Sequence, residues 1–263
     1  MRSGAMFWGG LLILLGVIFL LDNLGFFGDV NIWGLLWPIF LIALGVWLIW
    51  GYFFRRSPES EHATIPLEGS ARARIRVNHG AGRINISAHS DPGVLVVGDF
   101  GGGLDVKTRK DGEGLDVKMS VPTQFIPFSW YPGYSLDWNF SLYRDIPLSI
   151  ELNTGASDNR IDLSELKVSE VKLSSGASSS RIILPAQAGY TRVDIEAGAA
   201  AVDLSVPAGV AARIRSRGGL SSLKLDEARF PRFGDSYQSA DYDNAANKVE
   251  ISVQMGAGSV SVS

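Results

Sequence analysis

The residues that could carry chemistry in this 263-residue chain are few and scattered. The three histidines, His62, His79 and His89, lie in no cluster of histidine and carboxylate residues at the spacing of metal ligands. The chain has no cysteine, which excludes disulfides and thiol catalysis. The serines at 178–180 lack the Gly-x-Ser-x-Gly turn that exposes a nucleophilic serine. We therefore expect no metal, no cofactor and no catalytic residue.

Two further patterns resemble functional sites without meeting their requirements. The glycines at 101–103 are not followed by a Lys-Ser/Thr pair or a helix, so they do not predict a phosphate-binding loop. Five carboxylates could line up on one surface, as they do in β-helical carbohydrate enzymes: Asp158, Asp162, Glu165, Asp194 and Asp203. Such a row more often forms a solvated face. We expect neither an enzymatic activity nor a small-molecule substrate.

The charge balance argues against a nucleic-acid partner. The chain carries 24 Lys and Arg against 27 Asp and Glu, which gives a net charge of −3 at pH 7. No long block of one sign interrupts this balance. A general nucleic-acid binder needs a basic surface to neutralise phosphates, so this class is excluded.

Two apolar stretches without charge, at about 4–21 and 33–54, precede everything else. A bilayer core about 30 Å thick needs roughly 20 helical residues, so both stretches predict membrane-spanning helices. A cleaved signal peptide is the alternative for the first stretch. It is less favoured because no small-x-small cleavage site is evident and a second span follows at once. We assign 1–56 to a transmembrane helical hairpin and 57–63 to a linker.

Charges near the spans predict the orientation of the hairpin. Arg2 precedes the first stretch, and Arg55 and Arg56 follow the second, whereas the intervening loop holds Asp22 and Asp29 and no basic residue. The positive-inside rule then places both termini, and the whole region after the hairpin, in the cytoplasm. The lipid bilayer is the first expected partner.

Residues 64–263 read as one repeat domain. The glycines at 155, 176, 198 and 219 recur at intervals of 21, 22 and 21 residues. Each is flanked by small residues and by short segments in which apolar and polar residues alternate. A fixed period near 20 residues is typical of stacked coils, so the sequence predicts a β-solenoid-like architecture. The expected structural turns are Gly80, Gly155, Gly176, Gly198, Gly219 and Gly256.

The alternation predicts which side chains face the core. Around the turn at Gly176, we expect Ile182 and Leu184 to point inward, and Arg181 and Ile183 to point outward. The turn glycines are expected to have a positive φ or too little room for a Cβ atom.

Two tracts break the period. Residues 226–247 are polar and lengthen the last interval. Residues 121–144 contain eight aromatic residues and the prolines 122, 127 and 132, so we expect a loop there. This aromatic tract either covers an open flank of the β-core or forms an exposed contact patch. The candidate interface residues are Phe128, Trp130, Tyr131, Tyr134 and Trp138.

Several segments carry a family resemblance. The hairpin text LLILLGVIFLLDNLG, followed by WGLLWPIFLIALGVWLI, resembles the LiaI/LiaF-type transmembrane region of bacterial envelope-stress proteins. The segment PLEGSARARIRVNHGAGRINIS and the ending VEISVQMGAGSVSVS resemble the toast-rack β-domain of LiaF-like proteins. The resemblance covers nearly the whole chain and implies a membrane-anchored all-β protein without catalytic residues.

The resemblance also implies a role in the bacterial cytoplasmic membrane. LiaF-like members restrain a sensor histidine kinase until the envelope is damaged. The resemblance therefore implies that the partner is another membrane protein, such as a sensor kinase. The residues alone leave two alternatives open. One is a structural scaffold that assembles by self-association, and the other is an extracytoplasmic glycan-binding β-helix.

Overall fold

The computed structural model describes residues 37–38, 41–42, 60–122 and 136–263. The chain divides into two units, Met1–Arg55 and Arg56–Ser263. In the first unit Trp37, Pro38, Leu41 and Ile42 are helical. The rest of the predicted hairpin lies outside the described residues. Within the described ranges, no helix combines the length and apolarity that crossing a bilayer requires.

The described part of the second unit is a 13-stranded sheet without helices. Its strands are β1 (Ser60–Pro66), β2 (Arg72–His89), β3 (Val94–Gly101), β4 (Asp105–Asp111), β5 (Gly114–Ser120), β6 (Trp138–Tyr143), β7 (Pro147–Asp162), β8 (Lys167–Ile183), β9 (Tyr190–Ser205), β10 (Ala211–Leu225), β11 (Arg232–Phe233), β12 (Ser236–Gln238) and β13 (Lys248–Val262).

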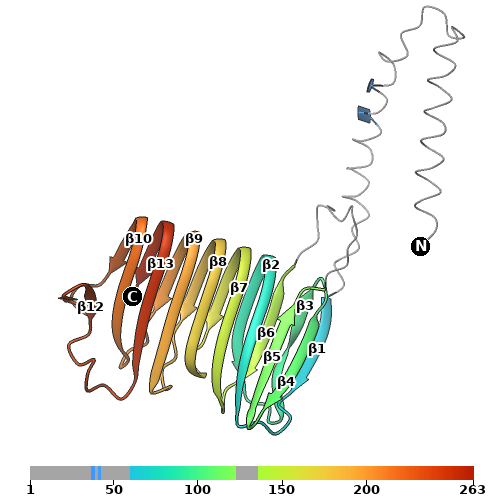
Figure 1. The fold of residues 1–263 in the computed structure, drawn as a ribbon, viewed down its shortest axis with the longest axis horizontal. Coiled ribbons are helices and arrows are strands. Elements are labelled where there is room, and N and C mark those ends of the chain that lie inside the picture. The colour runs from blue at the N-terminus through green and yellow to red at the C-terminus, as the bar shows by residue number, and fades with distance from the viewer. Residues whose placement is uncertain (1–36, 39–40, 43–59, 123–135) are drawn as a thin grey trace, which may run out of the picture. The chain divides into compact units, whose positions relative to one another are not determined.

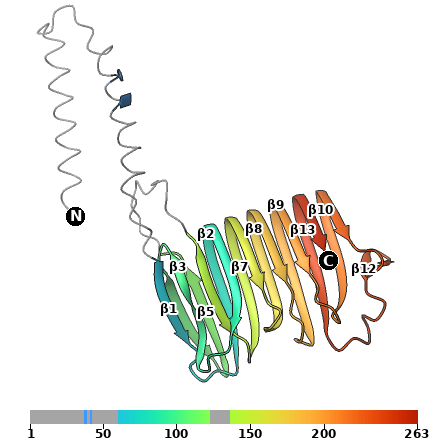
Figure 2. The same cartoon turned by 180° about the vertical axis from the view of Figure 1, so that it is seen from behind.

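Six long strands form a row of parallel neighbours, in the order β2, β7, β8, β9, β13 and β10 (Figures 1 and 2). The sequence repeat sets their register: Ile182 lies between Ile161 and Leu204 on the neighbouring strands. Apolar side chains therefore stack in columns across the row. Ile182 and Leu184 are fully buried, Arg181 is exposed and Ile183 is only partly buried, so the predicted faces are confirmed.

Each long strand changes its buried side at the repeat glycine. In β7, Ile150 and Leu152 are buried before Gly155, whereas Asn159 and Ile161 are buried after it. The buried positions shift from even to odd numbers because the strand bends at the glycine into two legs. Both legs then turn their apolar face toward one core, which gives the β-solenoid-like arrangement.

The order of the strands departs from the order of the chain at one place. The last strand, β13, lies between β9 and β10 and pairs with both over its whole length. The polar tract 226–247 makes this possible, since it carries the chain from β10 through the small β11–β12 hairpin back to β13. As a result β10, and not the C-terminal strand, is the last long strand of the row.

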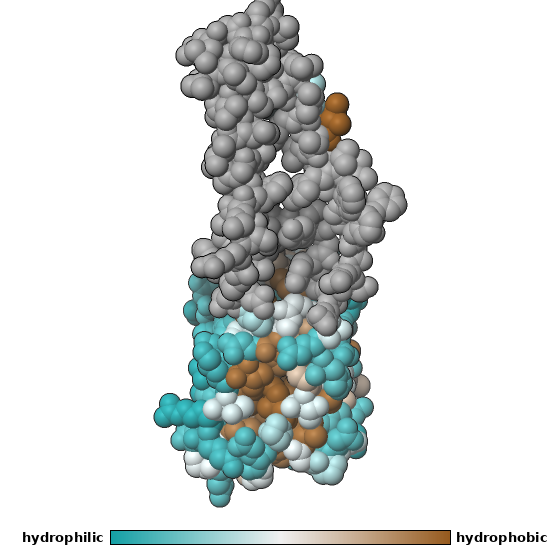
Figure 3. All heavy atoms as spheres, turned by 90° about the vertical axis from the view of Figure 1, so that its right-hand side faces the viewer, coloured by the Kyte–Doolittle hydropathy of each residue, from teal (hydrophilic) through white to brown (hydrophobic). Residues whose placement is uncertain are grey.

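The other end of the row is closed by additional strands. The first leg of β2 pairs with β5, and its second leg pairs with β6. Antiparallel strands extend both legs: β4 pairs with β5, and β3 and β1 continue from β6. Figure 3 views this end, where hydrophobic residues lie in the middle and hydrophilic residues surround them.

The predicted linker 57–63 is partly wrong. Strand β1 begins at Ser60, so residues 60–63 belong to the sheet. Most side chains of β1 are exposed, and only Ala63 and Ile65 face the core, so this edge strand is too short and polar at its start to stand out in the sequence.

Candidate functional site

The repeat glycines form a row at the bends of the long strands. In neighbouring strands, the glycine row comprises Gly80, Gly155, Gly176, Gly198 and Gly256. A Cβ atom added to Gly176 would lie 2.9 Å from the carbonyl oxygen of Gly155, and one added to Gly198 would lie 2.8 Å from that of Gly176. The backbones approach too closely for any larger residue. Gly219 lies within β10, but its surroundings are outside the described residues.

The close approach, and not an unusual backbone angle, explains the repeat glycines. None of the five has a positive φ. The expectation of a positive φ at these turns is therefore wrong, and the alternative expectation of too little room is confirmed for Gly155, Gly176 and Gly198. These glycines lie inside long strands, at their bends, because the pairing continues through the corner.

A broad groove of about 1320 Å³ follows the glycine row across the strands. One column of outward-facing side chains lines it: Asn78, Asn153, Ser174, Glu196, Gln254 and Arg217. The Nδ2 atom of Asn153 donates hydrogen bonds to Asn78 at 3.2 Å and to Glu151 at 3.0 Å. The lining is therefore polar and partly self-satisfied, and among its described residues no nucleophile is paired with a base.

His79 lies at one end of this groove but is only 2 % exposed. Its ring makes an edge contact with Trp138, with ring centres 5.0 Å apart. Neither ring nitrogen makes a hydrogen bond of good geometry within the described ranges. Burial lowers the pKa of His79, because the charged imidazolium loses its hydration, although the Leu136 backbone and the Asp137 carboxylate lie near enough to oppose part of this shift. A neutral histidine in an aromatic contact is a core residue.

Trp138 is the one candidate interface residue that the structure describes, and its assignment is wrong. Its side chain is fully buried in β6, its Nε1–H donates to the Gly101 carbonyl at 3.1 Å, and its ring packs edge-on against Phe100. It therefore helps to seal the core. Phe128, Trp130, Tyr131 and Tyr134 lie outside the described residues.

The carboxylates singled out in the sequence do not converge. Among the described residues, no three His, Cys, Asp or Glu side chains could hold a metal ion. Glu165 pairs with Arg144 at 3.0 Å, and Asp194 pairs with Arg192 at 2.7 Å. These are partly exposed ion pairs, and such pairs belong to a solvated face.

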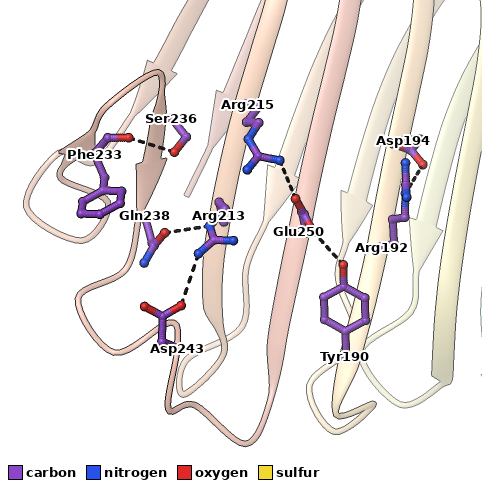
Figure 4. Close-up of polar contacts among 10 residues, drawn as sticks. All are labelled: Tyr190, Arg192, Asp194, Arg213, Arg215, Phe233, Ser236, Gln238, Asp243 and Glu250. Atoms are coloured by element: carbon purple, nitrogen blue, oxygen red, sulfur yellow. Dashed lines mark hydrogen bonds and ion pairs between the residues drawn. The ribbon is translucent and has the colours of Figure 1, made fainter.

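The opposite end of the row carries a cluster that the sequence analysis missed. Arg213, Arg215 and Arg217 of β10 alternate along the strand and therefore share its outward face. Together with Phe233, which is 67 % exposed on the β11–β12 hairpin, they line a cleft of about 670 Å³ that also holds Asp235. We call these three arginines and Phe233 the basic end; Figure 4 shows Arg213, Arg215 and Phe233.

Two of the three arginines have partners. Arg213 donates to Gln238 at 2.7 Å, pairs with Asp243 at 3.3 Å and stacks over the Tyr242 ring. Arg215 pairs with Glu250 at 2.7 Å (Figure 4). Arg217 is exposed and has neither an ion pair nor a hydrogen bond within the described part of the chain.

Tyr190 completes the network around Glu250. Its hydroxyl donates to Glu250 at 2.7 Å, on the other carboxylate oxygen from the one that Arg215 contacts. Burial and this carboxylate raise the pKa of Tyr190 to about 12, since both disfavour a phenolate. Glu250 is thus occupied by two donors and does not compensate Arg217.

Comparisons with known proteins agree with this architecture. Residues 6–49 match the family model of the LiaI-LiaF-like transmembrane region, and residues 54–205 match that of the N-terminal domain of toast_rack. No curated protein matches the chain. A crystal structure of a candidate cell adhesion protein from Clostridium sporogenes is 21% identical, with a TM-score of 0.69 over 78% of this chain and 98% of that one.

A second crystal structure, of a candidate adhesin from Bacteroides fragilis, is 8% identical over 79% of this chain and 98% of that one, with a TM-score of 0.29. The first of these likenesses supports the fold alone. The toast_rack match covers more than half of the chain, and it directly follows the transmembrane match, which indicates membrane association. This protein therefore belongs to the toast-rack family, in its LiaF-like form with a LiaI-LiaF-like transmembrane region.

Proposed function

We propose that this chain is a non-enzymatic membrane protein that restrains an envelope-stress sensor histidine kinase by protein–protein contact. The observation that carries the proposal is the order of the two family matches, with the transmembrane region at 6–49 and the toast-rack domain at 54–205. The pairing couples a membrane anchor to a rigid β-surface. Such an arrangement suits binding to another membrane protein.

The described side chains support contact more than catalysis. The long strands present polar and charged columns to solvent, and the groove along the glycine row contains no nucleophile paired with a base. The basic end adds a charged surface with an exposed aromatic ring. Exposed arginine and aromatic side chains are enriched at protein interfaces.

The proposal places both termini and the β-domain in the cytoplasm, with two membrane spans. It rests on Arg2, Arg55 and Arg56 flanking an acidic loop. In intact cells, a cysteine at the exposed position Ser263 should resist a membrane-impermeant thiol reagent, whereas one at Asn31 should react. The absence of native cysteine makes the readout clean. Labelling at Ser263 in sealed cells would contradict this orientation.

The kinase contact is tested with the full-length chain in its native membranes. Deleting its gene should raise the basal phosphorylation of the kinase's response regulator, and the tagged chain should co-purify with that kinase in mild detergent. A control truncated after residue 59 keeps the hairpin and removes the β-domain, so it separates anchoring from contact. If kinase output is unchanged by the deletion, both before and after envelope stress, the regulator role is excluded.

A further inference from the structure

The free edge of β10 has the chemistry of a receptor for one more strand. β13 pairs with β10 from Ala211 to Leu225, but on the other side β12 pairs only with Arg213 and Ile214. From Arg215 to Leu225, no described strand covers this second side. An uncovered edge presents main-chain donors and acceptors that an extended peptide can pair with.

The side chains of β10 specify which peptide would fit. β10 contains no acidic residue, and its charged residues are Arg213, Arg215, Arg217 and Lys224. On its inward face, Leu223 and Leu225 pack against the core but remain only partly buried. A covering strand would therefore place acidic residues outward and apolar residues inward.

The charge pattern across the row leads to the same requirement. In one outward column Arg192 of β9 is followed by Glu250 of β13 and then by Arg213 of β10, so opposite charges alternate between neighbouring strands. Opposite charges directly across a strand pair stabilise it, and like charges destabilise it. In this column the next position is taken by Gln238 of β12, whereas Arg215 and Arg217 lie beside Ser252 and Gln254 of β13. An acidic residue on their uncovered side would therefore supply the opposite charge that β13 does not place directly across from them.

The β12 strand shows how the edge is satisfied where it is covered. Gln238 of β12 lies directly across from Arg213, and its Oε1 atom accepts a hydrogen bond from that guanidinium at 2.7 Å. Arg215 and Arg217 have no such neighbour beyond β10 among the described residues. The cleft beside them is lined by Phe233, whose ring is solvent-exposed although it could pack against a bound side chain (Figure 4).

We propose that the edge of β10 from Arg215 to Leu225 binds an extended acidic segment of a partner protein by strand addition. Acidic side chains of the partner pair with Arg215 and Arg217, and the alternate apolar side chains cover Leu223 and Leu225. The same positive charges deter a second basic edge, so the site selects against copies of this chain. The inference does not require the partner to be a kinase.

The probe for this site is a fluorescent eleven-residue peptide in which glutamate alternates with valine and the alternation shifts by one residue at a central glycine, so that glutamate lies opposite Arg215 and Arg217 and valine lies opposite Leu223 and Leu225. Fluorescence anisotropy would measure its binding to the full-length chain in neutral detergent. A peptide with lysine in place of glutamate tests the charge. A peptide that alternates glutamate with proline keeps the charge but cannot pair as a strand, because proline lacks the amide donor.

The variant is Arg217→Glu, which reverses the one arginine of the basic end that has no partner among the described residues. It should weaken binding of the glutamate–valine peptide by about tenfold or more, since it turns an attraction into a repulsion. The matched control is Arg181→Glu, an equal charge change at an exposed position of β8, which has strands on both sides. Its affinity should stay within about twofold of that of the parent chain.

Several outcomes would overturn the inference. The parent chain could fail to bind the glutamate–valine peptide, or it could bind the glutamate–proline peptide equally well, which would indicate a simple anion site. Equal losses in Arg217→Glu and Arg181→Glu would place the effect outside β10. An oligomer of the parent chain that dissociates in Arg217→Glu, seen by light scattering, would make a second copy the occupant.

Discussion

The two ends of the strand row are finished in different ways. At the end near β2, three antiparallel strands extend the sheet: β4 beyond the first leg, and β3 and β1 beyond the second. At the end near β10, only the short strand β12 pairs with the outermost long strand, and it covers two residues. Stacked-repeat folds need caps because each coil relies on its neighbours for burial. The end near β2 is therefore extended by paired strands, whereas at the end near β10 the tract 226–247 covers part of the core with the fully buried Phe230, and no described strand pairs with the edge of β10 beyond Ile214.

Two aromatic residues, one at each end of the row, differ in exposure. Trp138 at the end near β2 is fully buried against Phe100 and His79, whereas Phe233 at the basic end is 67 % exposed. A large exposed aromatic side chain contributes little to the stability of the domain, but it is well suited to an interface. Phe230, three residues before Phe233, is fully buried, so both ends contribute an aromatic residue to the core, and Phe233 is the one at the basic end that is left available for contacts.

The charges on the edge strands argue against head-to-tail stacking, in which the β10 edge of one copy would pair with the opposite end of the next copy. The edge strand β4 carries Lys107, Arg109 and Lys110 against Asp105 and Asp111, and β10 carries only basic charges. Stacking one copy on the next would set the basic first leg of β10 against β4, which carries one more basic than acidic residue and is therefore repelled, although the other edge strand, β1, carries Glu61 and no lysine or arginine. A filament built by this head-to-tail contact is thus disfavoured, and so is that form of the scaffold alternative.

The largest effect is expected for Trp138→Ala. Removing a fully buried indole should lower the free energy of unfolding by about 3–5 kcal/mol, because it leaves a cavity beside Phe100. Phe233→Ala is the matched control at the basic end and should change it by less than about 0.5 kcal/mol. Urea unfolding of the full chain measures both. Similar losses at the two positions would remove the contrast between the ends.

A substitution in the glycine row should have an intermediate effect on the free energy of unfolding. Gly176→Ala should cost about 1–3 kcal/mol of unfolding free energy, since its Cβ atom would lie 2.9 Å from the Gly155 carbonyl oxygen. Gly80 begins the row and has nothing within 4 Å of a built Cβ atom. Gly80→Ala is therefore the control, with an expected change below about 0.5 kcal/mol. Equal melting of the two variants would show that crowding does not select these glycines.

The repeat could be predicted from the sequence because one physical constraint acts on every coil. Alternation fixes the buried face, and close backbone approach at the bend demands glycine, so Ile182, Leu184 and Gly176 were identified correctly. Only one of the two expected reasons for the glycines is correct. A positive φ and a crowded backbone both select glycine, so the sequence alone does not distinguish them.

The order of the strands could not be predicted in the same way. All coils share one alternation pattern, so nothing local indicates that β13 lies between β9 and β10. The basic end was missed for this reason: the alternating Arg213, Arg215 and Arg217 are visible in the sequence, but their place at an edge depends on that order. Trp138 was misassigned because neighbouring prolines suggested a loop, although the alternation of Trp138, Phe140 and Leu142 already indicated a buried strand.

The end near β2 should also be sensitive to acid through His79. Burial lowers its pKa below the ordinary 6.5, so on acidification the unfolded chain takes up a proton before the folded chain does. The contribution of the neutral His79 to the free energy of unfolding is fully present above pH 6.5 and is lost as the pH falls through the lowered pKa. Unfolding free energy measured between pH 7.5 and about 5 should fall more steeply in the parent than in His79→Phe. Equal slopes in the parent and in His79→Phe would contradict this assignment.

The smallest effect concerns the network beside the basic end. Tyr190→Phe removes the hydroxyl that donates to Glu250 and should cost about 0.5 kcal/mol at neutral pH, because the side chain is partly exposed. The pKa of Tyr190 is raised from 10.0 to about 12, so the neutral hydroxyl stabilises the fold below pH 10 and this contribution is lost as the pH rises toward 12. The difference in unfolding free energy between parent and variant should therefore shrink over that range. A difference that stays constant over that range would mean that it does not come from the neutral hydroxyl of Tyr190, and Arg215 would then be the main partner of the Glu250 carboxylate.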